Sequence, residues 1–228
     1  MMNPELFPEI VFEDPYLTVV VKPPQMLSED SDSPQSLARW LATRNKNGYV
    51  GVIHRLDRGV GGVMVYARTP EAAASLSRAV SENRVKKEYL AVVHGEPQSP
   101  RGSLSDLLFY DRARNKSFVV DRARKGVKEA RLEYRVLAAK DHPAYGKVSL
   151  VAITLQTGRT HQIRVQFSSR CHPLVGDGKY GANDHCPIAL FSHRLTLEHP
   201  KTKQLLSFEK EPDAPIFEDF LGAQKASE

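Results

Sequence analysis

The stretch GVIHRLDRGVGGVMVYAR, residues 51–68, contains a cluster of charged residues between two apolar segments. Two apolar runs, residues 50–53 and 63–67, flank a histidine, two arginines and Asp57. Short runs rich in Val and Ile are typical of buried strands. Charges held between buried strands cost free energy unless they are paired, so this loop is the most site-like place in the chain. The glycines that follow allow a sharp turn or a close approach to a ligand.

The bulk composition predicts one globular protein. The chain has 228 residues, of which 41% are hydrophobic and 26% charged, so a single domain over residues 1–228 is expected, with its core at about 10–221. The net charge of +5 suggests a polyanionic partner such as nucleic acid. Only two cysteines are present, which is typical of a reducing compartment. We see no secretory signal and no run of about 20 apolar residues, so a cytoplasmic protein without a membrane partner is predicted.

The order of local patterns predicts an α+β fold. Helices are expected over 34–44, from the Thr69-Pro70 cap to about Asn83, over 161–169 and over 215–221. Strands are expected over 10–22 (with a turn at Asp14-Pro15), 50–53, 63–67, 86–94, 130–137, 147–155, 188–198 and 204–209. Regular βαβ alternation is absent. Residues 98–128 are predicted to be a long surface excursion with a short hairpin, either a solvated loop or an arm that touches phosphates.

Three polar clusters are candidates for chemistry: residues 54–57, 87–89 and 157–164. In the third, His161 and Arg164 are three residues apart and would share a helix face. The amides of that helix start, with Arg159 beside them, would form an anion site. Cys171-His172 and His185-Cys186 do not have the spacing of zinc ligands, so no metal site is predicted.

The motifs of these clusters occur in one order along the chain. HRLD with its Gly-rich run is followed by KxYxAxxxG, then by TGRTHQIRVQ and HPLVGDGKYG, and VVVKPP precedes them all. From about Phe12 to about Phe208 the chain resembles the RluA-type family of pseudouridine synthases. It is similar to the short members that lack an N-terminal RNA-binding domain. The resemblance implies a mixed, mostly antiparallel sheet with flanking short helices and loops around a central RNA-binding cleft.

The resemblance also implies the reaction. A uridine of ribosomal or transfer RNA loses its C1′–N1 bond, the uracil turns, and C5 is joined to C1′. No metal and no organic cofactor are implied, and a monomer is expected. The target nucleotide must be flipped out of folded RNA to be reached.

By the family pattern, Asp57 is the catalytic carboxylate, Arg164 is the cation that keeps it ionised, and Tyr89 stacks on the uracil. The role of Asp57 is open between attack on the sugar, attack on the base and removal of a sugar proton. Arg55 is expected to fill the gap left by the flipped base. The other expected RNA contacts are Lys22, Arg58, Lys86, Lys87, Arg159, Lys179, His54 and His161. For the two histidines, a structural hydrogen bond is the alternative.

The chain departs from the family in two places. Val60-Gly61-Gly62 stands where Thr-Ser-Gly is common, and Lys22-Pro23-Pro24-Gln25 stands for KPxG. These changes put loop shape and substrate choice in question. They leave open a rival function, an RNA-binding or RNA-remodelling protein whose catalysis is weak or lost. A third hypothesis, a basic nucleotide-handling hydrolase, predicts free uracil as product.

Overall fold

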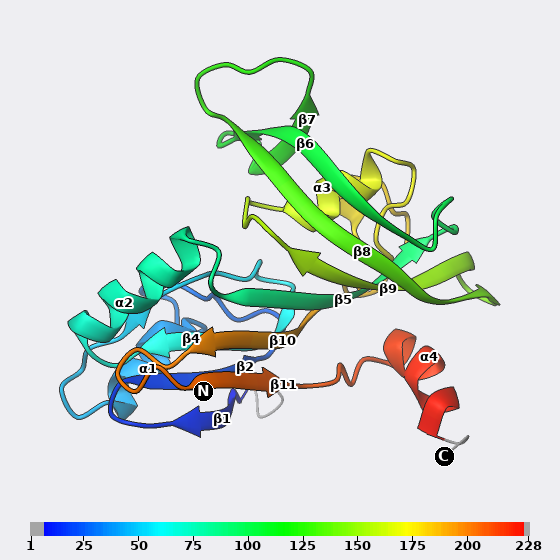
Figure 1. Cartoon of the computed structure of the whole chain (residues 1–228). Helices are drawn as coiled ribbons and strands as arrows, with labels where there is room; N and C mark the ends of the chain where they lie inside the picture. The colour runs from blue at the N-terminus through cyan, green and yellow to red at the C-terminus, as the bar shows by residue number, and fades with distance from the viewer. Residues whose placement is uncertain (1–6, 226–228) are drawn as a thin grey trace. The chain divides into compact units, whose positions relative to one another are not determined.

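The computed structural model describes residues 7–225, and the prediction of an α+β fold is confirmed (Figure 1). The described chain groups into two compact units. The first comprises the residues up to Lys87 together with Phe191–Glu211, and the second comprises Glu88–Leu190 together with the residues from Pro212 onward. The expected single catalytic domain remains a prediction, and each unit is described by itself.

The sheet of the first unit is built around β4 (Gly61–Ala67), all seven residues of which are buried. Its strands are β1 (Glu9–Glu13), β2 (Leu17–Lys22), β4, β10 (Leu190–Glu198) and β11 (Leu205–Glu209), with the short β3 (Gly51–Val52) also paired to β4. The pairing of β10 with β4 is parallel, and β1–β2, β2–β4, β3–β4 and β10–β11 are antiparallel. The predicted run over 50–53 is therefore shorter as a strand than expected.

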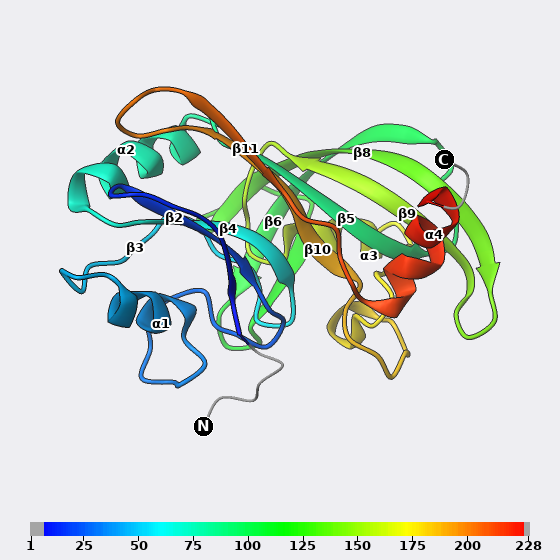
Figure 2. The same cartoon turned by 90° about the horizontal axis from the view of Figure 1, so that it is seen from below.

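Both faces of β4 are covered, which explains its uninterrupted apolar sequence. Val63 and Val65 pack with Leu76 on α2 (Pro70–Ser81) in one core cluster. Tyr66 points to the other face, because successive strand side chains alternate, and its hydroxyl donates to the carbonyl of Ser28 at 2.8 Å. Figure 2 shows α2 and α1 (Leu37–Arg44) on opposite sides of β2 and β4.

The two helix starts follow local capping rules. Thr69 caps α2 as predicted, since its hydroxyl accepts the amide of Ala72 at 3.2 Å. The start of α1 was predicted three residues too early. Ser36, and not Ser33, accepts the amide of Arg39 at 3.1 Å, and the chain becomes helical only at Leu37.

The sheet of the second unit has the order β5-β9-β8-β6-β7. Its strands are β5 (Lys86–His94), β6 (Arg101–Asp111), β7 (Lys116–Val120), β8 (Val127–His142) and β9 (Gly146–Leu155). The hairpin expected within the surface excursion over 98–128 is present as β6 and β7, but it is more regular than predicted, because β6 is an 11-residue strand paired with both β7 and β8. Its sequence, RGSLSDLLFYD, hides this, since only Leu104 and Leu108 are buried and the pairing is supplied by neighbouring backbone.

Short helices complete the second unit. They are α3 (Gln162–Ser168), the one-turn 3₁₀ helix η2 (Gly178–Tyr180) and α4 (Pro215–Lys225). His161 precedes α3 in the left-handed region, at φ 54°. The predicted helices over 161–169 and 215–221 are thus confirmed within a few residues, and η2 lies in a segment predicted to be loop.

Candidate active site

Asp57 lies in the loop between β3 and β4, and this loop is tied down on both sides of it. The Ser28 hydroxyl donates to the carbonyl of Leu56 at 2.9 Å and accepts the Leu56 amide at 3.0 Å. After Asp57, the amide of Val60 donates to the Asp57 carbonyl at 2.9 Å and closes a turn. The backbone therefore fixes the place from which the carboxylate projects.

Lys22, at the end of β2, holds the same loop from within. Its side chain is fully buried, and Nζ donates to the carbonyls of Pro23 (3.1 Å), Met26 (2.9 Å) and Arg58 (3.3 Å). Three acceptors match the three N–H bonds of an ammonium group. Burial lowers the pKa of Lys22 to about 7, and the negative charge of Asp57 opposes this shift. The predicted phosphate contact of Lys22 is contradicted by this burial, and the side chain instead positions the Asp57 loop.

We expect the free energy of unfolding to depend less on pH in Lys22→Met than in the parent protein. Between pH 7 and 10.5 the unfolded chain holds a proton at Lys22 that the folded protein has lost. The free energy of unfolding of the parent protein should therefore rise with pH, relative to Lys22→Met, by at most about 1.4 kcal/mol per pH unit. Urea unfolding at several pH values measures it. A difference between the two proteins that does not change with pH would contradict the assignment, and Lys46→Met, at an exposed lysine, is the control.

His54 is a neutral structural side chain. Its Nε2 accepts the amide of Val65 on β4 at 3.2 Å. Burial lowers the pKa of His54 to about 3, and the positive charge of Lys87 adds to the shift. Within the described residues, Nδ1 of His54 is buried without a hydrogen-bond partner. The alternative that His54 is a structural hydrogen-bonder is thus the one that this geometry supports.

Two arginines of the HRLD loop remain accessible. Arg55 is exposed and forms an ion pair with Glu29 at 3.2 Å, and both side chains are at least half exposed. Arg58 is exposed and donates to the Gln35 side chain at 2.7 Å. Exposed ion pairs contribute little free energy, so Arg55 can leave Glu29 at small cost. Its role as the residue that fills the gap in the RNA stays a prediction.

Within Val60-Gly61-Gly62, the structure shows why the last position must be glycine. A Cβ atom there would lie 2.3 Å from the carbonyl oxygen of Ser192 on β10, and φ is 122°. Only glycine fits this close approach of β4 and β10. A Cβ at Gly61 would meet atoms no nearer than 3.2 Å, and Val60 is buried. The shape of the loop therefore depends on the one glycine that the chain shares with the family pattern.

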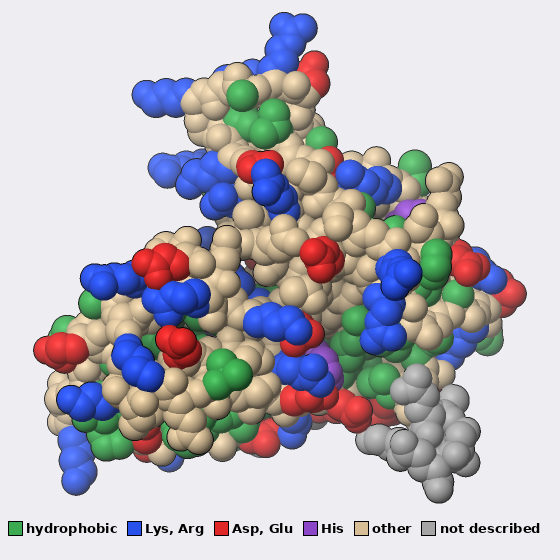
Figure 3. Space-filling view, in the orientation of Figure 1, with side chains coloured by type: hydrophobic (Ala, Val, Ile, Leu, Met, Phe, Trp, Pro, Cys, Tyr) green, Lys and Arg blue, Asp and Glu red, His purple; other side chains and the backbone are tan. Residues whose placement is uncertain are grey.

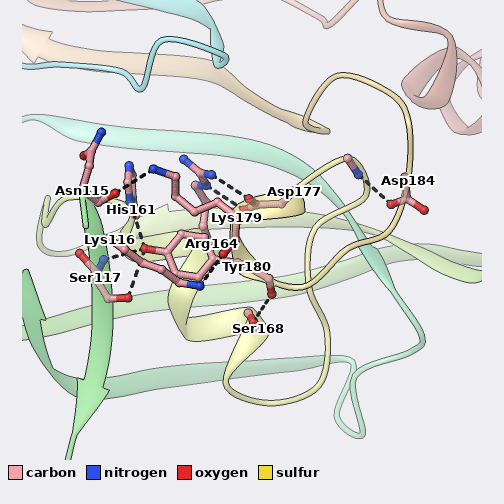
Figure 4. Close-up of polar contacts among 11 residues, drawn as sticks. Asn115, Lys116, Ser117, His161, Arg164, Ser168, Asp177, Lys179, Tyr180 and Asp184 are labelled. Atoms are coloured by element: carbon pink, nitrogen blue, oxygen red, sulfur yellow. Dashed lines mark hydrogen bonds and ion pairs between the residues drawn. The ribbon is translucent and has the colours of Figure 1, made fainter. Parts of the chain in front are cut away.

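In the second unit, Arg164 on α3 forms a two-pronged ion pair with Asp177 (Figure 4). Nε donates to Oδ2 and Nη2 donates to Oδ1, both at 2.7 Å. The Asp177 side chain is fully buried and that of Arg164 is 11% exposed. Such a pair fixes the plane of the guanidinium. The two hydrogen bonds to Asp177 use Nε and Nη2 and do not involve Nη1. The predicted pairing of Arg164 with Asp57 stays a prediction, because Asp57 belongs to the first unit.

Tyr180 links three elements around that ion pair. Its ring lies under the Arg164 guanidinium at 5.1 Å, and its hydroxyl interacts with Nδ1 of His161 at 3.0 Å. The hydroxyl also accepts the amide of Ser117 on β7 at 2.8 Å. Burial raises the pKa of Tyr180 to about 12, so the hydroxyl stays protonated. His161 precedes α3 and does not share a helix face with Arg164, but both side chains contact Tyr180.

Asp177 and Tyr180 were missed as site residues at the sequence level. Both lie in HPLVGDGKYG, which was recognised as a motif but not resolved into roles. The one local hint is that Asp177 lies two residues after the apolar pair Leu174-Val175. A buried carboxylate needs a cation, but the hint does not say which cation it meets.

The remaining predicted residues are placed as follows. Tyr89 is buried on β5, where Lys86 is exposed and Lys87 is buried, so of the two lysines Lys86 is the more suited to a phosphate contact. Arg159 donates through Nε to the Glu129 carbonyl at 2.8 Å, and Lys179 donates to the Asn115 carbonyl at 2.9 Å. The expected anion site at the start of α3 is not favoured, because the Gln162 side chain accepts the Arg159 amide there at 3.0 Å.

Comparison with known proteins places this geometry in a family. Residues 16–169 match the RNA pseudouridylate synthase family, a span that includes the Asp57 loop, Tyr89 and Arg164. The chain belongs to this family. It is similar to ribosomal large subunit pseudouridine synthase D of Nitrosomonas europaea, with 31% identity over 96% of this chain and 64% of the relative. It is also similar to the dual-specificity RNA pseudouridine synthase RluA of Haemophilus influenzae, with 31% identity over 92% of this chain and 97% of the relative.

A solved structure supports the assignment of the fold to this family. Human RNA pseudouridylate synthase domain containing 1 matches 95% of the family member described here and 89% of its own chain, with a TM-score of 0.76 and 25% identity. The chain spans less than two thirds of the length of the Nitrosomonas relative. Among the described residues, no helix is both long and apolar enough to cross a bilayer.

Proposed function

We propose that this family member is an RNA pseudouridine synthase that isomerises uridine in ribosomal or transfer RNA. The observation that carries the proposal is the family match over residues 16–169, which contains the HRLD loop that Lys22 holds at the Arg58 carbonyl. The relatives named above modify ribosomal RNA or have dual specificity by their names, and this supports RNA as the substrate.

The proposed chemistry needs one carboxylate beside the ribose. The C1′–N1 bond breaks, the uracil turns, and C5 bonds to C1′, while C5 loses a proton and N1 gains one. Atoms and charge balance within the nucleotide, so no external reactant is consumed. Asp57 serves this sequence as a nucleophile or as a base, and in either role it must be ionised.

The other residues are proposed to support Asp57. Arg164, oriented by Asp177 and Tyr180, is suited to offer Nη1 to a carboxylate because its other two nitrogens bind Asp177. Tyr89 is proposed to stack on the flipped uracil, and Arg55 to occupy the space that the nucleotide leaves. The protein is proposed to act as a monomer in the cytoplasm. The two cysteines, which form no disulfide, support the compartment.

The experiment is pseudouridine mapping. Total RNA from a strain lacking the gene is incubated with the purified protein, and new pseudouridines are located by base-resolution mapping. One or a few new sites in ribosomal or transfer RNA support the proposal. RNA binding without any pseudouridine favours the rival RNA-binding function, and free uracil in the supernatant favours hydrolysis.

A further inference from the structure

The net charge of the chain is concentrated in one segment of the second unit. Residues 111–128, which we call the basic arm, contain seven Lys or Arg residues and two Asp residues. The net charge of the arm is therefore +5, equal to that of the whole chain, and the remaining residues balance one another. The excess positive charge thus lies on the basic arm and is not spread over the surface. This indicates that a polyanionic partner binds the arm.

The basic arm presents its cations to solvent. It runs from the end of β6 through strand β7 to the first two residues of β8, and all of residues 121–126 are exposed. Figure 3 shows Lys and Arg side chains gathered on this part of the second unit, at the top of the view. The Arg114–Asp111 and Arg122–Asp121 pairs are long, at 3.6 and 3.8 Å. Exposed pairs of this length contribute almost nothing, so their arginines remain available.

The arm is fixed at its base beside the Arg164 cluster. The Ser117 amide donates to the Tyr180 hydroxyl at 2.8 Å, and Lys116 lies over the Tyr180 ring at 4.8 Å. The Ser117 hydroxyl donates to the Thr160 carbonyl at 2.6 Å, just before α3. These contacts hold β7 at a constant distance from Arg164, so an RNA strand bound at one would be held near the other (Figure 4).

Cations lie over the two phenylalanine rings of the arm and its partner strand. The guanidinium of Arg124 covers Phe109 at 5.0 Å, and Lys116 lies over Phe118 at 5.9 Å. Tyr110 uses its hydroxyl to bind the Asn115 side chain at 2.8 Å. Recognition of unpaired bases needs exposed rings on which the bases stack, whereas phosphates need only cations.

We propose that the basic arm binds the sugar–phosphate backbone of the RNA flanking the target uridine, without reading base identity. This inference rests on the proposed function for the identity of the polyanion. The arm contributes affinity and orientation, and the chemistry stays with the groups in the Asp57 loop and around Arg164. Binding by phosphates alone is dependent on salt and independent of sequence, which gives the inference a specific signature.

The test replaces four exposed cations with glutamine: Arg112, Arg122, Lys125 and Lys128. Lys116 and Arg124 are kept because they pack on rings. The control replaces four exposed cations of the first unit with glutamine, namely Lys46, Arg78, Lys201 and Lys203, so that both variants have the same net charge. Thermal unfolding of each variant verifies that it is folded.

Binding to a fixed RNA is measured against salt concentration. The arm variant should bind about tenfold or more weakly at low salt, and the slope of log K against log salt should decrease in magnitude by about 3, since each phosphate contact contributes about 0.7–0.9. The control should keep nearly the parent slope. In turnover assays the arm variant should raise KM and leave kcat unchanged.

Each failure points to one proposal. Equal slopes for the arm variant and the parent, or equal losses in both variants, overturn the arm inference. A loss that depends on the base sequence of the flanking RNA also overturns it, because the arm would then read bases. If the parent forms no pseudouridine, the proposed function fails, while the salt slopes still decide whether the arm binds RNA.

Discussion

Replacement of Asp177 with alanine is expected to destabilise the second unit by about 3–5 kcal/mol. The reason is that the variant leaves the Arg164 guanidinium, only 11% exposed, without the carboxylate that now binds it through two hydrogen bonds. The orientation of the guanidinium is lost as well, so pseudouridine formation should fall even at temperatures where the variant is folded. Urea unfolding at neutral pH measures the loss of stability. The initial rate of pseudouridine formation on a substrate RNA measures the loss of activity.

A double variant separates the cost of leaving Arg164 as an unpaired buried charge from the loss of the contacts between Arg164 and Asp177. Asp177→Leu combined with Arg164→Met replaces the buried pair with apolar side chains and should recover most of the lost stability, because no uncompensated charge remains. It should recover no activity. Asp213→Ala removes an exposed acid of the same unit and is the matched control. A cost below about 1 kcal/mol for Asp177→Ala, or strictly additive costs in the double variant, would contradict the role assigned to the pair.

Much of the fold could be predicted because its signals are local. The run from Val63 to Ala67 is buried on both faces and reads as a strand without any help from the rest of the chain. Thr69-Pro70 places the start of α2 correctly, since a cap is satisfied within one helical turn. Strand β6 could not be predicted in the same way, because its regularity comes from hydrogen bonds to β7 and β8 rather than from its own pattern of side chains.

The same distinction applies to the candidate site. The family resemblance implies a phosphate contact for Lys22, and lysine side chains are mostly exposed. In the structure Lys22 is buried and donates to the carbonyl of Arg58, 36 residues further along the chain. The sequence alone does not show that these two residues are neighbours. Asp177 and Tyr180 were likewise invisible as partners of Arg164, since their pairing depends on how η2 meets α3. Motif order identified the family, and only the structure identified what supports each motif.

Replacing Asp57 with asparagine is expected to lower the rate of pseudouridine formation by more than about a thousandfold. Asparagine has the shape of aspartate but can neither carry the negative charge nor act as base or nucleophile. The loop should keep its conformation, because it is held by backbone contacts at Leu56 and by Lys22 at Arg58. Binding of RNA should change much less than turnover, which distinguishes loss of chemistry from loss of folding.

The most direct measurement is tritium release from RNA labelled at C5 of its uracils, which reports the exchange of the C5–H bond for the C5–C1′ bond. The parent protein, Asp57→Asn and Asp32→Asn are compared on the same RNA, the last being a control at a fully exposed acid. The account predicts that the parent and Asp32→Asn release tritium in step with pseudouridine, and that pure Asp57→Asn releases none above background. Release by Asp57→Asn at a rate near that of the parent would contradict it.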